Sequence, residues 1–111
     1  EHDDVPQQVS LRLAQVQGYL LNGYYASAQT SLNQVLETVE ALAQPERFYA
    51  AWGALAVEVH LAQGDLENAA MLVPNTLYQA EMARDYPTVA LAGVYKGLVA
   101  KHHGDLRQAA E

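Results

Sequence analysis

The chain has 111 residues, the length of one domain, and 50% of them are hydrophobic. Its 13 acidic and 6 basic residues give a net charge of −7, which disfavours binding to nucleic acid or to an anionic membrane. There is no cysteine, which excludes disulfide bonds and thiolate metal sites, and no apolar run approaches the roughly 20 residues of a membrane span.

The first residues, EHDDVPQQ, are acidic and polar and do not form a signal-peptide pattern. They have the character of a fragment boundary rather than of a natural start. We therefore expect a cytoplasmic chain in which residues 1–111 form a single domain of a larger protein.

Apolar residues recur at helical spacing along most of the chain, whereas strand patterns are poor. From the N-terminus, the pattern predicts helices at about 6–22, 25–43, 46–63, 65–83 and 87–103, followed by a short helix from 105. Pro6, Pro45 and Pro87 fall near the starts of these segments, where the missing N–H of proline costs little. Pro74 lies inside the fourth segment instead, so we expect a kink or break of the helix there.

A short motif, Gly-Asp-Leu-x-x-Ala-Ala, occurs at 64–70 and again at 104–110. A related pattern, a glycine with an alanine five positions later, occurs at Gly23 and Ala28. The three glycines are 41 and 40 residues apart, and a period of this size indicates stacked helical hairpins.

Each motif suits a tight turn between two antiparallel helices. Glycine adopts the left-handed backbone conformation that often ends a helix, and the aspartate after it can accept the free N–H groups that begin the next helix. The small alanine lets the two helices approach closely. The residues that we assign to the three turns are Gly23, Gly64, Asp65, Ala69, Gly104, Asp105 and Ala109.

In these motifs the chain resembles the tetratricopeptide repeat family, which has a small residue and an aromatic in the first helix of each repeat, then a Gly-Asp turn and a fixed alanine. Gly18 and Tyr19 before Gly23, and Gly97 before Gly104, match the first-helix pattern. The repeat is longer than the usual length of about 34 residues, no tryptophan stands in register, and the closing proline is missing. The closer likeness is to the longer repeats of MalT-type bacterial transcription activators.

The resemblance implies an all-α fold, a right-handed superhelical stack of antiparallel helix hairpins with about 2.5 repeats of 40–41 residues. The units would be residues 6–43, 46–83 and 87–111. It also implies a protein-interaction or scaffold module in a bacterial signalling protein or transcription regulator. The parent would contact DNA elsewhere, because this segment is too acidic.

In this family the first helices line a concave surface that binds a protein or peptide. When the repeats are aligned on their turn glycines, the resemblance implies that the residues at these surface positions are Leu13, Gln17, Leu20, Ala54, Glu58, Val94, Leu98 and Lys101. They form a mostly apolar lane with a few polar heads, which could seat a peptide helix or an extended segment. The alternative, that the apolar members pack between hairpins, carries equal weight.

The last long predicted helix has only seven residues after Gly104 to cover it. Repeat stacks need polar caps at their ends, so we expect an exposed apolar end through which the chain can form homo-oligomers. The residues expected there are Leu91, Val94, Tyr95, Leu98 and Val99.

No pattern indicates catalysis, a cofactor or a metal, and we expect that the chain is not an enzyme. His102 and His103 diverge on a helix, and His60 lies near a helix end, where the helix dipole favours histidine. The seven tyrosines suit either packing or a binding surface. Two further functions stay open, a small-molecule sensor that holds an inducer near Pro74 and a purely structural spacer.

Overall fold

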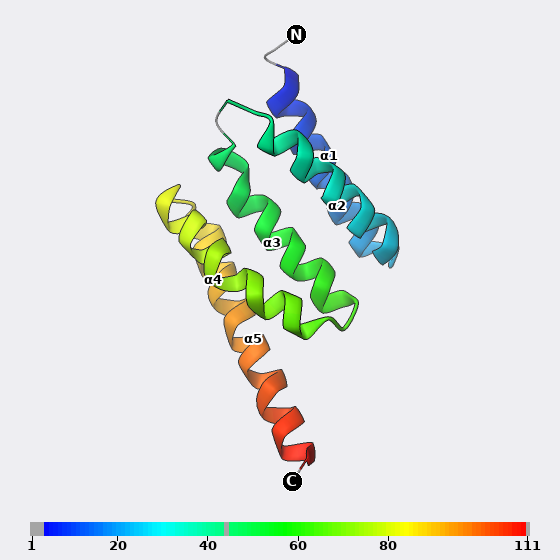
Figure 1. Ribbon diagram of the computed structural model, residues 1–111, viewed down its shortest axis with the longest axis vertical. Coiled ribbons are helices and arrows are strands. Elements are labelled where there is room, and N and C mark those ends of the chain that lie inside the picture. Colours follow the sequence, from blue (N-terminus) through cyan, green and yellow to red (C-terminus); the bar gives the residue numbers. More distant parts are fainter. Residues whose placement is uncertain (1–3, 44, 111) are drawn as a thin grey trace.

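The computed structural model describes residues 4–43 and 45–110, and this part of the chain is helical, without strands. Five helices follow one another along it (Figure 1). They are α1 (Asp4–Leu21), α2 (Tyr25–Glu40), α3 (Glu46–Ala62), α4 (Leu66–Met82) and α5 (Tyr86–Ala110). The prediction of an all-α fold is confirmed, and the predicted boundaries from the first helix to the start of the fifth are met to within three residues.

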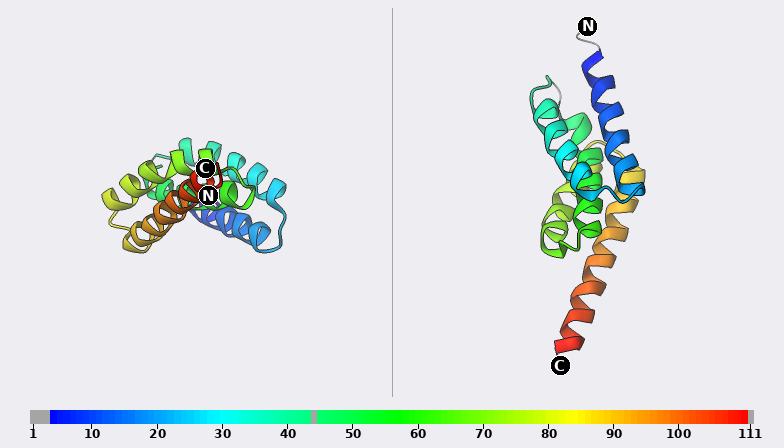
Figure 2. Two further views of the ribbon diagram at one scale, coloured as in Figure 1. Left: turned by 90° about the horizontal axis from the view of Figure 1, so that it is seen from below. Right: turned by 90° about the vertical axis from the view of Figure 1, so that its right-hand side faces the viewer.

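Helix α3 lies at the centre of the molecule and contacts each of the other four helices. α1 also pairs with α2, and α4 with α5. α2 and α4 lie on one side of the molecule and α1 and α5 on the other, while the C-terminal half of α5 extends away from the remaining helices (Figure 2). The molecule is therefore elongated, with extents of 58 × 30 × 19 Å.

Three clusters of apolar side chains around α3 form the core. Two of them join α3 to α1 and α2, and the third joins it to α4 and α5. Their buried members are Val9, Leu13, Val35, Val39 and Phe48, then Val16, Ala28, Leu32, Ala56 and Val59, and finally Ala54, Val57, Ala69, Val73 and Tyr95. Most stand at helical spacing in the sequence, so each helix buries one stripe against its neighbours.

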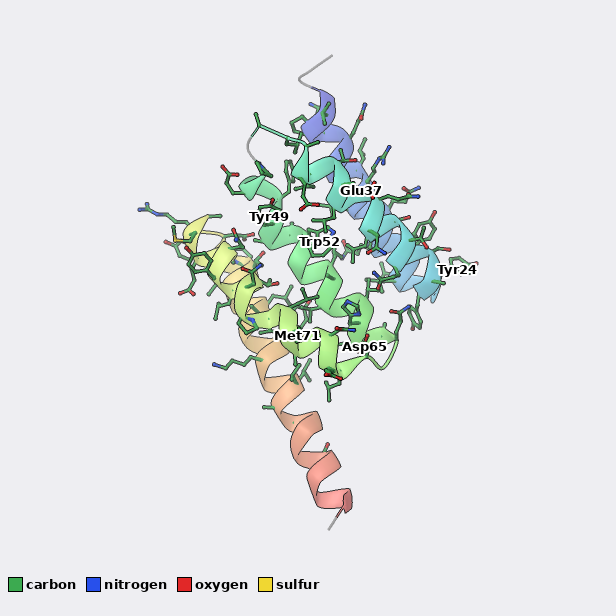
Figure 3. The ribbon with its side chains drawn as sticks, viewed as in Figure 1. Tyr24, Glu37, Tyr49, Trp52, Asp65 and Met71 are labelled. Carbon is green, nitrogen blue, oxygen red and sulfur yellow. The ribbon has the colours of Figure 1, made fainter. Side chains whose placement is uncertain are left out.

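Trp52 of α3 links the first two clusters, because it packs against both. The indole of Trp52, which is labelled in Figure 3, donates its N–H in a hydrogen bond of 2.9 Å to the backbone carbonyl of Leu32 in α2. A partly buried indole needs a partner for its N–H, and this carbonyl supplies one across the helix interface. The bond therefore ties α3 to α2.

Gly53 and Thr76 mark a close approach of α3 to α4. Gly53 is buried, and a β-carbon added there would overlap the hydroxyl oxygen of Thr76 and lie 3.2 Å from its Cβ atom. Thr76 is itself 2% exposed. Only glycine therefore fits at position 53 without a shift of one helix.

Three of the bends between helices share one hydrogen-bond pattern, at Gly23, Gly64 and Arg84. In each, the N–H of the next residue donates to the carbonyl five residues before it, at 2.8 Å, as in a Schellman motif. The φ angles at the three bends are 78°, 76° and 57°. Two bends fall at glycines assigned to turns, and the third falls between the predicted helices 65–83 and 87–103, where no left-handed turn at Arg84 was predicted.

Asp65 and Asp85 follow two of these bends and cap the next helix. Asp65 accepts hydrogen bonds from the backbone N–H of Asn68 at 3.2 Å and from its side-chain amide at 2.6 Å. Asp85 accepts from the backbone N–H of Thr88 at 3.3 Å and from its hydroxyl at 2.6 Å. Gly64-Asp65 and Arg84-Asp85 therefore build equivalent turns.

At Gly104 the structure differs from the predicted turn, because α5 continues through it to Ala110. Gly104 and Asp105 are exposed, and the side chain of Ala109 lies outside the described part of the chain. The bends at Gly64 and Arg84 are each followed by a helix that packs back on the one before it, whereas residues 105–110 continue α5. Glycine inside a helix costs only about 1 kcal/mol, so the helix continues instead.

Pro74 does not break α4, which runs from Leu66 to Met82 with the proline inside it. The helix changes direction along its length (Figure 1). Because proline has no N–H, the carbonyl of Ala70 loses its usual partner in the helix. The predicted break is therefore absent, while the helix bends.

Candidate functional site

The residues predicted to line a concave surface divide into buried and exposed sets. Leu13 and Ala54 are only 7% and 8% exposed and belong to the core. Leu20 is half-buried and packs against the second core cluster. The exposed members are Gln17, Val94, Leu98 and Lys101, and Glu58 is half-buried. Packing between helices thus accounts for Leu13 and Ala54, and the predicted lane is not continuous.

Glu58 of α3 lies close to the hydroxyl of Tyr95 of α5. Tyr95 is only 4% exposed, and its hydroxyl has no hydrogen-bond partner of good geometry in the described part of the chain. Burial, and then the neighbouring Glu58 carboxylate, raise the pKa of Tyr95 well above its usual value. The tyrosine is therefore uncharged at neutral pH, and the two side chains connect α3 to α5.

One side of α5 carries a row of apolar residues that remain partly exposed to solvent. Leu91, Val94 and Leu98 are 37%, 57% and 43% exposed, and Lys101 is exposed at the end of the row. Spacings of three and four residues place these side chains on one side of the helix. We call these four residues the α5 face.

Two residues of α5 that we expected to be exposed are instead buried. Tyr95 and Val99 are 4% and 8% exposed. Tyr95 packs with Val73 of α4 and Val57 of α3. Because α4 covers this side of α5, the exposed end is narrower than the sequence predicts.

A second exposed row lies on α4 and was missed by the sequence reasoning. Met71, Tyr78 and Met82 are 71%, 57% and 68% exposed, and Pro74 is exposed between them. Both methionines of the chain are in this row. We call these four residues the α4 face. The spacing of three, four and four residues indicates that these side chains share one side of the helix, but the sequence shows that this side is exposed only once the buried stripe of the same helix is known.

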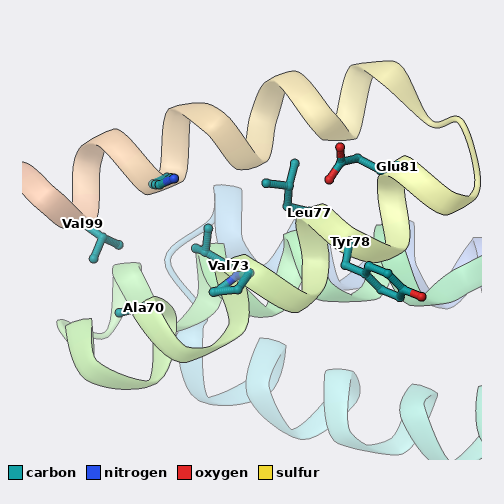
Figure 4. A pocket seen from close by; sticks show the side chains of 8 residues that line it. Ala70, Val73, Leu77, Tyr78, Glu81 and Val99 are labelled. Atoms are coloured by element: carbon teal, nitrogen blue, oxygen red, sulfur yellow. The ribbon is translucent and has the colours of Figure 1, made fainter.

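A groove of about 250 Å³ runs between α4 and α5 beside the α4 face (Figure 4). Its apolar lining residues are Ala70, Val73, Pro74, Leu77, Tyr78 and Val99. Leu77 and Glu81 extend from α4 toward α5, and Val99 extends back toward Ala70. The groove and the α4 face share Pro74 and Tyr78, so together they form one surface.

Two charged side chains, Glu81 of α4 and Lys96 of α5, also line the groove. They do not pair with each other: in the described part of the chain the one contact within 4 Å between a basic and an acidic side chain joins His60 and Asp65. An approaching molecule would therefore meet a carboxylate and an ammonium group that no described side chain neutralises.

The His60 Nδ1 atom lies 3.5 Å from a carboxylate oxygen of Asp65. The hydrogen bonds from Asn68, first from its side chain and then from its backbone, lower the pKa of Asp65. Among the described residues no group of three or more histidine, aspartate or glutamate side chains could hold a metal ion. The side chains of His102 and His103 lie outside that part.

Comparison of the chain with protein families, with curated protein sequences and with solved structures finds no match. Within residues 4–43 and 45–110, no helix is long and apolar enough to cross a membrane. The α5 face, the α4 face and the groove beside it are therefore the features on which a function can be argued.

Proposed function

We propose that this chain is a stack of helical hairpins of the tetratricopeptide type and serves as a protein-interaction module of a larger regulatory protein. Two features support the stack: α1, α3 and α5 contact one another in order, and equivalent turns recur at Gly23 and Gly64. Such stacks bind partners on pre-formed surfaces, without covalent chemistry. In a transcription regulator, DNA contacts would belong to another segment, because this one has a net charge of −7.

The α5 face is the single observation that carries the interaction role. A row of apolar residues at helical spacing is what a helix normally buries against a neighbour. Here Val94 and Leu98 remain half-exposed, with Lys101 beyond them. We assign this face to a helix of a partner protein that presents apolar side chains and a carboxylate placed to meet Lys101.

Site-specific photo-cross-linking tests the role directly. A photoreactive residue at position 91 of the α5 face, in the parent protein, should cross-link to a defined partner in cells. The same residue at position 21 is the matched control, because Leu21 is 83% exposed but lies on α1. Cross-linking of the same proteins from both positions would contradict the proposal.

A pair of substitutions distinguishes a partner from a second copy of the chain. Val94→Gln with Leu98→Gln should abolish the cross-link and leave the fold intact, since both side chains are about half-exposed. Light scattering of the unmodified chain then reports self-association. A dimer that these substitutions dissociate would mean that the α5 face binds another copy of this chain.

The groove beside Pro74 favours a second candidate function, the sensing of a small molecule. A ligand that binds only the folded chain raises its melting temperature, so a thermal-shift screen of sugars and metabolites tests this directly. The volume of about 250 Å³ is below the range of roughly 300–1,000 Å³ for drug-sized ligands. The screen should therefore find weak binders at most. A spacer role would be left if neither the screen nor the cross-linking gave a signal.

A further inference from the structure

The α4 face is exposed although the rest of α4 is well packed. Ala69, Val73, Thr76 and Ala80 form the buried stripe of this helix. Met71 and Met82, in contrast, are about two-thirds exposed, and Tyr78 is 57% exposed. Methionine and tyrosine are common at surfaces that bind other proteins, because methionine adapts its shape and tyrosine offers apolar area with a polar tip.

The size of the neighbouring groove points to side chains of a protein as its occupant. About 250 Å³ is small for a separate ligand but holds two or three apolar side chains. The groove follows α4 from Ala70 to Glu81, about three turns of helix. A helix that lies along α4 could insert residues of one stripe into it and cover Met71 and Met82 as well.

Charge further restricts the occupant. α4 contains two glutamates, Glu67 and Glu81, and no basic residue. They are 14 residues apart, about 21 Å along the helix, and lie at the two ends of the α4 face. Glu46 of α3 adds a third carboxylate beside Tyr78 and Met82. None of these carboxylates has an ion-pair partner in the described chain.

The nearby cations are placed differently. Lys96 follows Tyr95, which packs against Val73, so Lys96 lies level with the middle of the groove and on its α5 wall. Arg84 lies in the turn beyond the end of α4. Glu67 thus stands at one end of the α4 face and Glu81 and Glu46 at the other, and among the described side chains that line the groove the basic one, Lys96, is near its centre.

We propose that the α4 face and the adjoining groove bind an amphipathic α-helix of another protein, with its apolar stripe flanked at both ends by lysine or arginine. The stripe enters the groove and covers Met71, Tyr78 and Met82. The flanking cations pair with Glu67 at one end and with Glu81 and Glu46 at the other. This surface is separate from the α5 face, so its binding does not depend on the function proposed above.

Two designed peptides of about 16 residues, which span about 24 Å as helices, serve as probes. Both carry four leucines spaced four, three and four residues apart, so that the leucines form one stripe of the helix. The two peptides differ only in the residues that flank this stripe at both ends, which are lysines in one peptide and glutamates in the other. Fluorescence anisotropy with the full chain should show about tenfold tighter binding of the lysine-flanked peptide at about 50 mM salt. The preference should shrink at about 500 mM salt, where surface charges are screened.

Substitutions locate the binding. Met71→Gln with Met82→Gln should abolish it, whereas Leu11→Gln with Leu21→Gln, at side chains of similar exposure on α1, should not. Glu46→Gln combined with Glu67→Gln and Glu81→Gln should remove the preference for lysine but leave residual binding. Val94→Gln with Leu98→Gln should have no effect, which separates this surface from the α5 face.

Each contrary result overturns the inference. Equal binding of the two peptides, or tighter binding of the glutamate-flanked one, would refute the charge assignment. Binding that survives the paired methionine substitutions would mean that the peptide attaches elsewhere on an acidic protein. If neither peptide binds and the methionine substitutions instead dissociate a dimer seen by light scattering, the α4 face contacts a second copy.

Discussion

Replacing Gly53 by alanine tests how closely α3 and α4 pack. The new β-carbon would overlap the hydroxyl oxygen of Thr76 and would lie 3.2 Å and 3.3 Å from the Cβ and Cγ2 atoms of that residue. Thr76 is 2% exposed and cannot turn into solvent. Either its side chain must rotate or the two helices must move apart.

The expected loss of stability follows from two opposing terms. Overpacking of a well-packed interface costs about 1–3 kcal/mol, and a direct overlap with a buried neighbour belongs at the upper end of that range. Alanine is favoured over glycine inside a helix by about 1 kcal/mol. Gly53→Ala should therefore lower the free energy of unfolding by about 1–2 kcal/mol, a fall in melting temperature of roughly 4–8 °C.

Gly93→Ala is the matched control, because Gly93 is also inside a helix and a β-carbon there would meet nothing within 4 Å. It should raise stability by up to about 1 kcal/mol. Urea titrations followed by circular dichroism measure both variants. Thr76→Ala removes the overlapping hydroxyl, so Gly53→Ala should cost less in that background. If Gly53→Ala stabilises the chain as much as Gly93→Ala does, the close approach of α3 to α4 is wrong.

Three further predictions concern the turns and Trp52. Arg84→Gly should stabilise the chain by up to about 1 kcal/mol, since a φ of 57° strains an arginine. Gly64→Ala should destabilise it instead. Thermal melts compare the two variants, and the opposite order would contradict the left-handed bend at Arg84. The folded-state pKa of Asp65 is below its usual value of 3.8, so its carboxylate stabilises the fold above that pH and this contribution is lost as the pH falls through the lowered value. Asp65→Asn should therefore reduce stability at pH 7 more than at pH 2 in urea titrations, and an equal loss at both would argue against the Asn68 hydrogen bonds. Trp52→Phe should lower the free energy of unfolding by about 1 kcal/mol, because it removes the hydrogen bond to the Leu32 carbonyl. Circular dichroism is the measurement, because Trp52 is the only tryptophan and the variant has no tryptophan fluorescence to follow. An unchanged unfolding midpoint would mean that the bond contributes nothing to stability.

Helix positions were predictable because they depend on local features of the sequence. The apolar period places Val9, Val35 and Val57 on buried stripes. Gly23 and Gly64 stand where a helix ends and the backbone turns left-handed. Such signals need no knowledge of the tertiary structure, and so the boundaries from the first helix to the start of α5 agree to within three residues.

The candidate binding surfaces were less predictable, because exposure depends on which neighbours a helix acquires. Leu13 and Leu98 are both leucines at helical spacing, yet they are 7% and 43% exposed. Leu13 has α2 and α3 beside it, whereas no described helix covers the outer side of α5 at Leu98. In the same way, Met71 and Tyr78 could not be recognised as a surface until the opposite stripe of α4 was known to be buried.

The turns at 64, 84 and 104 show why a motif alone does not decide a fold. Gly104-Asp105 repeats the residues of Gly64-Asp65 but lies inside an unbroken helix. Arg84-Asp85 lacks the glycine and still bends, with φ at 57°. What the two bends share is a capping aspartate, together with a following helix that packs back on the one before it, α4 on α3 and α5 on α4. That packing outweighs the strain at Arg84. If the segment after Gly104 formed a helix that packed back on α5, the same packing would favour a turn at this glycine.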